Sequence, residues 1–368
     1  MTSPATHPAA EPAPAEAGVA GAGVPDLDLY LAGVGNVGGA LLKQIRALPG
    51  RPVRVIGACR RGRSAFDASG LADDAALGDT APDWPGLVAR LAEHARERPT
   101  VLVDATGSDQ GADWVEPALA AGVSVVTPSK LANTRSQASY DRLRALATGR
   151  VHYRYETTAG AGLPVVATVE SLVATGDRVR TIRGVLSGTL TYLFGQIERG
   201  MAFSDAVRRA HVQGYTEPDP RDDLSGEDVA RKLLILARSA GLRIERSDFE
   251  VESLVPSEAA GVPLALVTDA LAGADDAWRH RADDAAARGQ RLRYVGEIDG
   301  RSGALRVGVQ AVPADSPLGA LSGTDNLVEV VTDRYAASPL VVQGPGAGPE
   351  VTAAGVLADV LAVARALA

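Results

Sequence analysis

The clearest pattern of apolar and polar residues lies near the start of the chain. Leu27, Leu29 and Leu31 alternate with other residues as in a β-strand, and from Leu41 to Leu48 apolar residues recur at helical spacing. Glycines separate these two stretches. The pattern predicts a strand, a tight turn and a helix. Apolar runs over 101–106 and 122–130 predict two further strands of the same α/β domain.

From residue 151 the pattern changes. Residues 152–172 begin as a strand, pass through a Gly/Ala turn and become helical from Leu163 and Pro164. Residues 178–200 predict another strand, turn and helix. The stretch 211–241 is the most polar of the chain, and a helix is expected to begin near Gly226. These ranges predict a second domain after residue 150.

The first 25 residues have a different composition. They contain five prolines among alanines and glycines, and neither lysine nor arginine. Such a segment buries too little apolar surface to offset its chain entropy, so we expect disorder over 1–25. It also lacks the basic start and leucine-rich centre of a signal peptide.

Composition narrows the class of protein. The chain has 368 residues, long enough for about two domains, and a net charge of −8 from 37 basic and 45 acidic residues. The negative balance argues against a dedicated nucleic-acid binder. A single cysteine, Cys59, excludes an internal disulfide, and no Cys/His cluster has zinc-ligand spacing. No apolar run approaches the length of a membrane helix. We expect a cytoplasmic protein.

The turn after the first strand has the spacing G-x-G-x-x-G. In a strand–turn–helix context its glycines allow a tight turn, approach of a pyrophosphate and close packing of helix on strand. The helix N-terminus then offers free N–H groups to phosphates. The alternative is an α/β turn without a cofactor. The predicted dinucleotide contacts here are Gly33, Gly35, Asn36, Val37 and Gly38.

Basic residues occur near the end of the predicted second strand, 51–66. A site that prefers NAD usually has a carboxylate at this strand end, but here Arg60, Arg61 and Arg63 occur instead. Because guanidinium groups match phosphate geometry, we favour NADP over NAD, with Arg60 the main 2′-phosphate contact. The alternative is a solvated surface run.

Two further positions follow predicted strands. Ligands of parallel sheets bind at the carboxyl ends of the strands. Thr106 ends the apolar run 101–106, and Lys130 lies just beyond 122–130. Both are candidates to approach the cofactor, and Lys130 also to approach a substrate, the alternative being an ordinary surface lysine.

Six acids occur within the twelve residues 217–228, on a loop stiffened by two prolines. Asp228 and Lys232 lie four residues apart and share a helix face. By ordinary statistics this pair is a surface salt bridge. The density of carboxylates around one lysine favours a second interpretation, in which Lys232 transfers a proton and Glu217 and Asp228 bind a small polar substrate.

A possible cation site lies at the start of the second domain. Glu156 precedes three residues whose carbonyls can converge on one point, Ala159, Ala161 and Leu163. One carboxylate with several carbonyls suits a monovalent hard cation. From spacing alone, a plain strand–turn–helix is the better interpretation.

One long segment resembles the signature of a known family. QGYTEPDPRDDLSGEDVARK, residues 213–232, is similar at nearly every position to the signature of homoserine dehydrogenases. Other motifs occur in the family's order: the glycine turn, TPSK at 127–130, ETTAGAGLP at 156–164, GVLSGTLTYL at 184–193, SPLGALSGTDN at 316–326 and QGPGAGPEVTAAGVLAD at 343–359. The resemblance spans residues 26–368.

The resemblance implies reversible oxidation of L-homoserine to L-aspartate 4-semialdehyde with NAD(P), in threonine and methionine biosynthesis. It implies Lys232 as proton donor and acceptor, Lys130 beside cofactor and substrate, and a sodium ion at the Glu156 site. The implied substrate-binding acids are Glu217, Asp223 and Asp228, and the glycines beside the nicotinamide are Gly214 and Gly348. Glu217 is also expected to contact the cofactor.

The resemblance also implies the architecture. The expected fold class is α/β: an N-terminal Rossmann-type dinucleotide-binding domain (26–150) and an α+β catalytic and dimerisation domain with a mixed sheet (151–343). A C-terminal helix (344–368) is expected to return to the first domain. The sequence ends soon after this helix, so we expect the short form without an ACT domain, acting as a homodimer. Ser129 replaces the asparagine that usually precedes the loop lysine.

Two other functions are compatible with parts of the pattern. A related dehydrogenase, such as an aspartate semialdehyde enzyme, needs a catalytic cysteine, and Cys59 lies on the predicted cofactor strand, far from the acidic loop. A non-catalytic dinucleotide sensor has no use for Lys232 among carboxylates.

Overall fold

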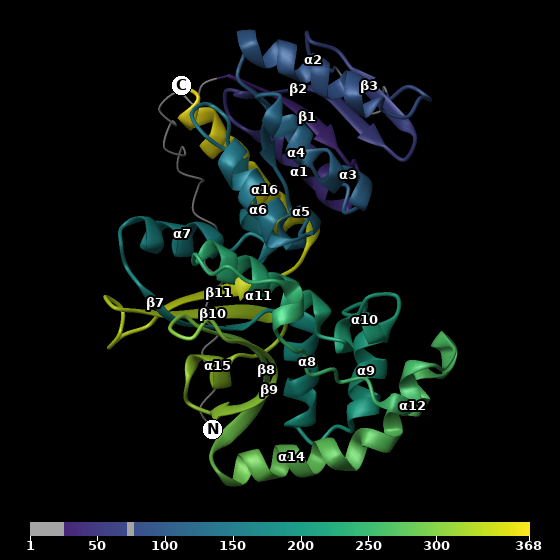
Figure 1. The fold of residues 1–368 in the computed structure, drawn as a ribbon. Helices are drawn as coiled ribbons and strands as arrows, with labels where there is room; N and C mark the ends of the chain where they lie inside the picture. The colour runs from purple at the N-terminus through teal and green to yellow at the C-terminus, as the bar shows by residue number, and fades with distance from the viewer. Residues whose placement is uncertain (1–25, 72–76) are drawn as a thin grey trace, which may run out of the picture.

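The computed structural model describes residues 26–71 and 77–368, so the disorder expected for 1–25 lies outside the described residues. Two lobes, each built around one sheet, lie one above the other in Figure 1. Within the described ranges, no helix is long and apolar enough to cross a membrane. The division of the chain at residues 150 and 343 stays a prediction.

The first lobe contains a six-stranded sheet, parallel except at one edge. Its order is β3 (Arg63–Phe66), β2 (Val53–Arg60), β1 (Leu27–Ala32), β4 (Thr100–Asp104), β5 (Ser124–Val126) and β6 (Tyr153–Arg154). β1 is buried along its whole length, because both of its faces are covered by helices. β6 extends this sheet just past the expected boundary at 150.

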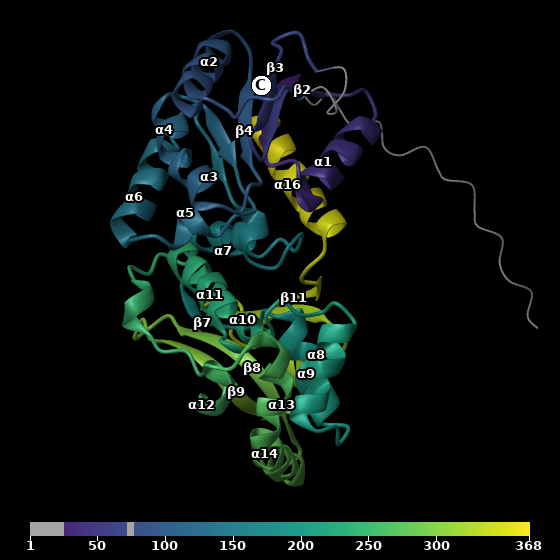
Figure 2. The same cartoon turned by 90° about the vertical axis from the view of Figure 1, so that its right-hand side faces the viewer.

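Helices from different parts of the chain cover the two faces of this sheet. One face packs against α1 (Asn36–Ala47) and the C-terminal helix α16 (Pro349–Ala366), which share an apolar cluster with Leu29 and Leu31. The opposite face packs against α2 (Trp84–Glu97), α4 (Val115–Ala120) and α6 (Gln137–Leu146). The short helices α3 (Asp109–Asp113) and α5 (Leu131–Thr134) follow β4 and β5. Figure 2 shows α16 beside α1.

The prediction of one continuous second strand over 51–66 is wrong, because the structure has two strands there. The chain reverses at Arg61 and Gly62, whose positive φ values of 33° and 77° close a tight turn, and β3 pairs antiparallel with β2. Asn-Gly and similar pairs favour such turns because both central residues have positive φ. Arg61 is an uncommon first residue for one, which is why the pattern did not predict the hairpin.

The second lobe contains a five-stranded sheet. Its order is β11 (Leu340–Pro345), β10 (Asp325–Thr332), β7 (Val179–Val185), β8 (Gln290–Asp299) and β9 (Leu305–Pro313). The fold class is confirmed, but the expectation of a mixed sheet is wrong, since all four pairings between these strands are antiparallel. Consecutive strands β8 and β9 form a hairpin, so no parallel crossover is needed here.

Helices pack on both faces of the second sheet. α8 (Gly188–Ile197) and α11 (Glu227–Ser239) contact β8 on one face, and α15 (Pro317–Ala320) closes a small apolar cluster on the other. The remaining helices surround α8 or join the lobes: α7 (Val166–Ala174), α9 (Phe203–Val212), α10 (Pro220–Leu224), α12 (Ser257–Ala260), α13 (Val267–Ala270) and α14 (Asp275–Ala287). α11 lies at the junction of the lobes (Figure 2).

A buried carboxylate joins three elements at the amino end of β1. Asp28, 1% exposed, accepts hydrogen bonds from Arg54 at 2.8 and 2.7 Å and from Arg98 at 3.0 Å, and contacts His94 Nε2 at 2.6 Å. Burial alone would raise the pKa of Asp28, but the hydrogen bonds from Arg54 and His94 outweigh it and lower the pKa. The ionised carboxylate therefore stabilises the fold.

We predict that Asp28→Asn lowers the free energy of unfolding at pH 7 by about 2–3 kcal/mol, because charged hydrogen bonds are lost. Since the pKa of Asp28 is lower in the folded chain, its contribution is complete above the ordinary aspartate pKa and is lost as pH falls through the folded value. Melting temperatures from pH 7 to pH 3 should therefore converge for the variant and the wild type. Asp26→Asn, at an exposed carboxylate 3.9 Å from Arg98, is the control. A difference that grows toward pH 3 would contradict this account.

Candidate active site

The glycine turn has the geometry that its spacing predicts. A Cβ on Gly33, where φ is 102°, would lie 2.5 Å from the Ala105 backbone, and one on Gly38 would lie 2.1 Å from the Gly33 carbonyl oxygen. A Cβ on Gly35 would meet no atom within 4 Å. The first and third glycines therefore satisfy packing, whereas the second faces open space. That space lies at the N-terminus of α1, where Asn36 and Val37 present backbone N–H groups.

The ends of β4 and β5 are held together by a buried aspartate. Asp104, 2% exposed, accepts hydrogen bonds from the backbone and hydroxyl of Thr106 at 3.1 and 2.7 Å. The Thr127 hydroxyl donates to the Asp104 carbonyl at 2.9 Å. Burial raises the pKa of Asp104. This network fixes the segment that leads from β5 to Lys130, the residue at which α5 begins.

Lys130 and Lys232 meet at one carboxylate, although they belong to different lobes. Lys232 Nζ lies 2.9 Å from Asp228 Oδ2, and Lys130 Nζ lies 3.2 Å from Asp228 Oδ1. Lys232 also donates to the Leu186 carbonyl at 2.7 Å and is 12% exposed. Burial would raise the pKa of Asp228, but the two ammonium groups hold it well below its ordinary range. Asp228 and Lys232 are thus more than a surface pair.

The acidic loop is fixed to α8 by hydrogen bonds. The Thr189 hydroxyl lies 2.5 Å from the Tyr215 carbonyl and 2.9 Å from Asp223 Oδ1, and Asp223 Oδ2 accepts from the Glu217 backbone at 2.8 Å. Burial raises the pKa of Asp223. Within the described chain, the Glu217 carboxylate has neither a hydrogen bond nor an ion pair. It is therefore available to a ligand.

One cavity of about 760 Å³ brings eight of the predicted residues together, among them both lysines and the three acids. It lies at the junction of the lobes and receives residues from α1, α5, the acidic loop, α11 and the turn before α16. The predicted residues that line it are Val37, Lys130, Ala161, Glu217, Asp223, Asp228, Lys232 and Gly348. A cavity lined by two lysines and several carboxylates suits a small polar substrate that exchanges a proton.

Other predicted residues do not line this cavity. Gly214 is exposed and has φ of 72°, and its N–H donates to the His211 carbonyl at 3.0 Å. These features are typical of a glycine that ends a helix, so in the structure Gly214 terminates α9. Arg60 is exposed at the end of β2, on the hairpin turn.

Two neighbours of Arg60 are engaged by the protein itself. Arg63 donates to the Leu77 carbonyl at 2.7 Å and lies 3.3 Å from Asp79, and the Ser64 hydroxyl donates to the Thr80 carbonyl at 2.9 Å. These contacts hold the hairpin against residues 77–80. Of the arginines at this turn, Arg60 and Arg61 have no such contact in the described part of the chain.

The Glu156 segment forms a capped turn. The Glu156 carboxylate accepts from the backbone of Val166 and Ala167, both at 2.7 Å, and so caps the start of α7. Burial raises the pKa of Glu156 and also that of Asp359, to about 7, which accepts from the Glu156 N–H at 3.0 Å. The carbonyls of Ala159 and Ala161 accept no hydrogen bond from the described residues, and Ala161 has φ of 52°. Those carbonyls, rather than the carboxylate, are available to a cation.

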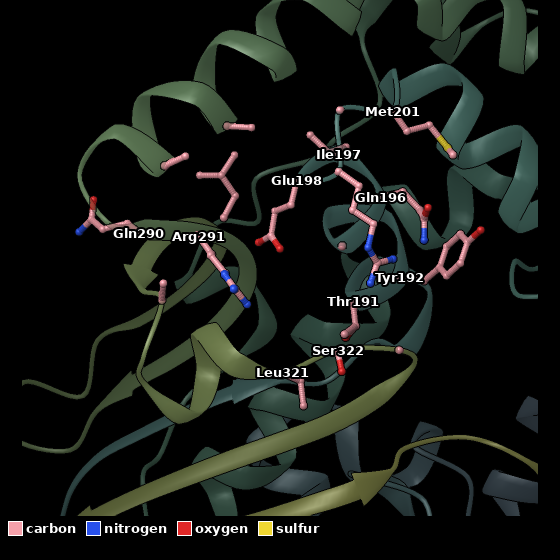
Figure 3. A pocket seen from close by; sticks show the side chains of 18 of the residues that line it. Thr191, Tyr192, Gln196, Ile197, Glu198, Met201, Gln290, Arg291, Leu321 and Ser322 are labelled. Atoms are coloured by element: carbon pink, nitrogen blue, oxygen red, sulfur yellow. The ribbon is translucent and has the colours of Figure 1, made fainter. Parts of the chain in front are cut away.

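A second cavity, of about 750 Å³, lies between α8, α14 and β8. Figure 3 shows Glu198 and Arg291 among the side chains around it. Glu198 pairs with Arg293, whose side chain is 2% exposed and donates to carbonyls of the α15 turn. None of the predicted site residues lines this cavity.

The sequence patterns missed several residues of the site. Thr189 contacts the acidic loop, and Ser187 and Thr157 line the cavity. The Leu186 carbonyl accepts a hydrogen bond from Lys232. The amino-acid composition contains one signal that points to this cavity. Only three of the 37 basic residues are lysines, and two of these, Lys130 and Lys232, line the cavity.

Two family models match parts of this chain. One matching family model is described as homoserine dehydrogenase, over residues 164–361, and another as its NAD binding domain, over 33–156. The homoserine dehydrogenase of Paracoccidioides brasiliensis is 38% identical over 92% of this chain and 98% of its own length. A crystal structure of a Candida auris protein of unknown function has a TM-score of 0.86 and 36% identity, over 92% of this chain and 98% of that chain.

Some relatives are much longer. The chloroplastic bifunctional aspartokinase/homoserine dehydrogenase 2 of Zea mays is 46% identical over 269 residues. The match covers 73% of this chain, which spans only 29% of the length of the maize protein.

The glycine turn gives a paired prediction. Gly35→Ala should leave the melting temperature nearly unchanged, because its methyl group meets no protein atom within 4 Å, but weaken binding of a nicotinamide dinucleotide about tenfold by obstructing the pyrophosphate. Gly38→Ala should cost about 1–3 kcal/mol of stability, because its Cβ overlaps the Gly33 carbonyl. Thermal melts and fluorescence titration with NADPH separate the two effects. Equal loss of stability in both variants would refute this assignment of roles.

Proposed function

The chain belongs to the homoserine dehydrogenase family, and on this basis we propose that it oxidises L-homoserine reversibly to L-aspartate 4-semialdehyde with NADP. The observation that supports this most directly is the contact of Lys130 and Lys232 with one carboxylate, Asp228, in a cavity that also receives Glu217 and the start of α1. The family's nicotinamide cofactor would bind along the glycine turn, whose second glycine faces open space.

Lys232 is the proposed proton carrier. When bound at the glycine turn, the family's nicotinamide cofactor would supply hydride transfer to or from the hydroxyl-bearing carbon of the substrate. Oxidation also requires removal of the hydroxyl proton, and reduction requires its return. Lys232 Nζ is fixed by Asp228 and the Leu186 carbonyl, so its remaining donor position is oriented by two contacts. Lys130, on the cofactor side, is proposed to orient the substrate oxygen.

The acidic residues are proposed to bind the substrate ammonium group. Glu217 has an unpaired carboxylate at the cavity, and Asp223 holds the Glu217 backbone in place. Both acids therefore favour a substrate with a positive charge at one end and a hydroxyl at the other. Homoserine has this form.

The observed surroundings of Cys59 disfavour the aspartate semialdehyde enzyme as an alternative. Its thiol is 4% exposed on β2, and burial raises its pKa. Reactive cysteines need a lowered pKa and access to substrate. An assay of homoserine-dependent NADPH formation separates the proposed enzyme from this alternative and from a non-catalytic sensor.

Three further features complete the proposal. The carbonyls of Ala159 and Ala161, which accept no hydrogen bond from the described residues, fit a monovalent cation such as sodium, with Glu156 and Leu163 completing the turn. Soaking crystals with thallium(I) would test this site. A homodimer is proposed across the second sheet, where Val341 on edge strand β11 is 40% exposed, and sedimentation would test it.

The single buried cysteine suits the cytoplasm, where fractionation should find the protein.

Lys232→Ala should reduce kcat by roughly 10²–10⁴-fold, because the proton carrier is removed. NADPH binding should change little, since the glycine turn is untouched. Lys43→Ala, at the exposed third lysine on α1, is the control and should retain full kcat. A Lys232→Ala variant that keeps more than about a tenth of wild-type kcat would rule out this role.

The cofactor preference is proposed to depend on Arg60. Its guanidinium is exposed and without a partner in the described chain, whereas Arg63 is engaged by Leu77 and Asp79. Arg60→Ala should reduce kcat/KM for NADP about tenfold and leave kcat/KM for NAD nearly unchanged, because one charged hydrogen bond to the 2′-phosphate is lost. Arg63→Ala should mainly lower the melting temperature. A wild-type preference for NAD would overturn the proposal.

A further inference from the structure

A buried arginine joins the two lobes behind the active site. Arg238 lies on α11, ten residues after Asp228, and its side chain is fully buried. All of its N–H groups have acceptors: the Ile244 carbonyl at 3.2 and 2.9 Å, the Asn133 and Arg135 carbonyls at 2.7 and 2.8 Å, and Glu245 Oε2 at 3.2 Å. Its guanidinium also lies over the Tyr140 ring, 5.5 Å from the centroid. Because every N–H group of the planar guanidinium is bonded, the Arg238 side chain has one fixed geometry.

The carbonyls that Arg238 holds belong to the same short segment as Lys130. Lys130 is the N-cap residue of α5, and its own carbonyl accepts from the backbone of Asn133 at 3.1 Å and of Thr134 at 3.0 Å. Arg238 binds Asn133 and Arg135, the end of that turn. The segment that presents Lys130 is therefore attached to α11 at Arg238 and again at Asp228.

A second set of contacts strengthens the same attachment. Glu245 Oε1 accepts from the Gln137 N–H at 2.8 Å, at the start of α6, and the Gln137 side-chain oxygen accepts from the Ile244 N–H at 3.1 Å. Segment 244–245 is thus bonded both to Arg238 and to the first lobe. Figure 2 shows α11 directly below α5 at this junction.

We infer that Arg238 is a positioning residue, which fixes α11 against α5 so that Lys130 from one lobe and Lys232 from the other meet at Asp228. This inference rests on the proposed function for its kinetic consequence. Lys130 is 27% exposed, and among the described residues its ammonium is held by a single 3.2 Å contact, too weak to define how the lobes pack. The buried, fully bonded arginine supplies the rigid contact. Misplacement of reacting groups by about 1 Å is enough to cost roughly 10²-fold in rate.

The test compares Arg238→Lys with Arg243→Ala. Lysine retains the positive charge at position 238 but lacks the planar guanidinium group, so it cannot bind all the carbonyls together. Arg243 forms an ion pair with Asp141 across the same junction at 2.8 Å but is 72% exposed, which makes it a matched control. Arg238→Lys should lower kcat about tenfold or more while the KM for NADP stays within about twofold. Arg243→Ala should change neither.

A readout without turnover separates this inference from the proposed function. The chain has three lysines, so labelling by an amine-specific reagent can be followed peptide by peptide. In Arg238→Lys, Lys130 should be labelled several times faster than in the wild type, relative to exposed Lys43, because its contact with Asp228 loosens. If the wild type fails to oxidise homoserine, the proposed function fails, but the labelling still tests the attachment.

A milder variant covers the case in which Arg238→Lys does not fold. Glu245→Gln keeps the shape of the segment and removes one charged acceptor of Arg238. It should produce the same two changes, faster labelling of Lys130 and lower kcat, at smaller size. A fall in melting temperature alone, with kcat and Lys130 labelling unchanged in every folded variant, would overturn the inference.

Discussion

The site depends on one carboxylate placed between two ammonium groups. Asp228 contacts Lys130 from the first lobe and Lys232 from its own helix, and each lysine would otherwise repel the other. The carboxylate is half exposed, so this contact alone stabilises the arrangement only modestly. The surrounding structure must hold both lobes in register. α11 meets that requirement, because it is buried along most of its length and its Arg238 donates to the Asn133 and Arg135 carbonyls.

The two lobes supply different physical properties to the cavity. The first supplies backbone: glycines without side-chain obstruction, a helix N-terminus and strand ends fixed by Asp104. The second supplies side chains with charge, on a loop whose shape is fixed by Thr189 and Asp223. Neither set is complete by itself. Chemistry that needs a dinucleotide and a small charged substrate in contact is therefore possible only at the junction.

Local patterns predicted much of this arrangement. The glycine spacing identified the turn at Gly33, and proline and acid density identified the loop before Asp228, since both depend on neighbouring residues. The Lys130–Asp228 contact and the bonds of Arg238 could not be predicted, because they join residues about 100 apart in sequence. A buried arginine has no local pattern that distinguishes it from a surface one. Gly214 is a different case, because a positive φ at a helix end already accounts for that glycine, and its place beside the nicotinamide stays a prediction.

The position of α16 has a consequence for biosynthesis. This helix covers the same face of the first sheet as α1, and its Val356, Val360 and Val363 are fully buried there. This helix is synthesised about 320 residues after β1. At ordinary rates of translation the part of this face that α16 covers stays exposed in the nascent first lobe for on the order of tens of seconds. During that interval it offers chaperones a binding surface that the finished molecule no longer exposes.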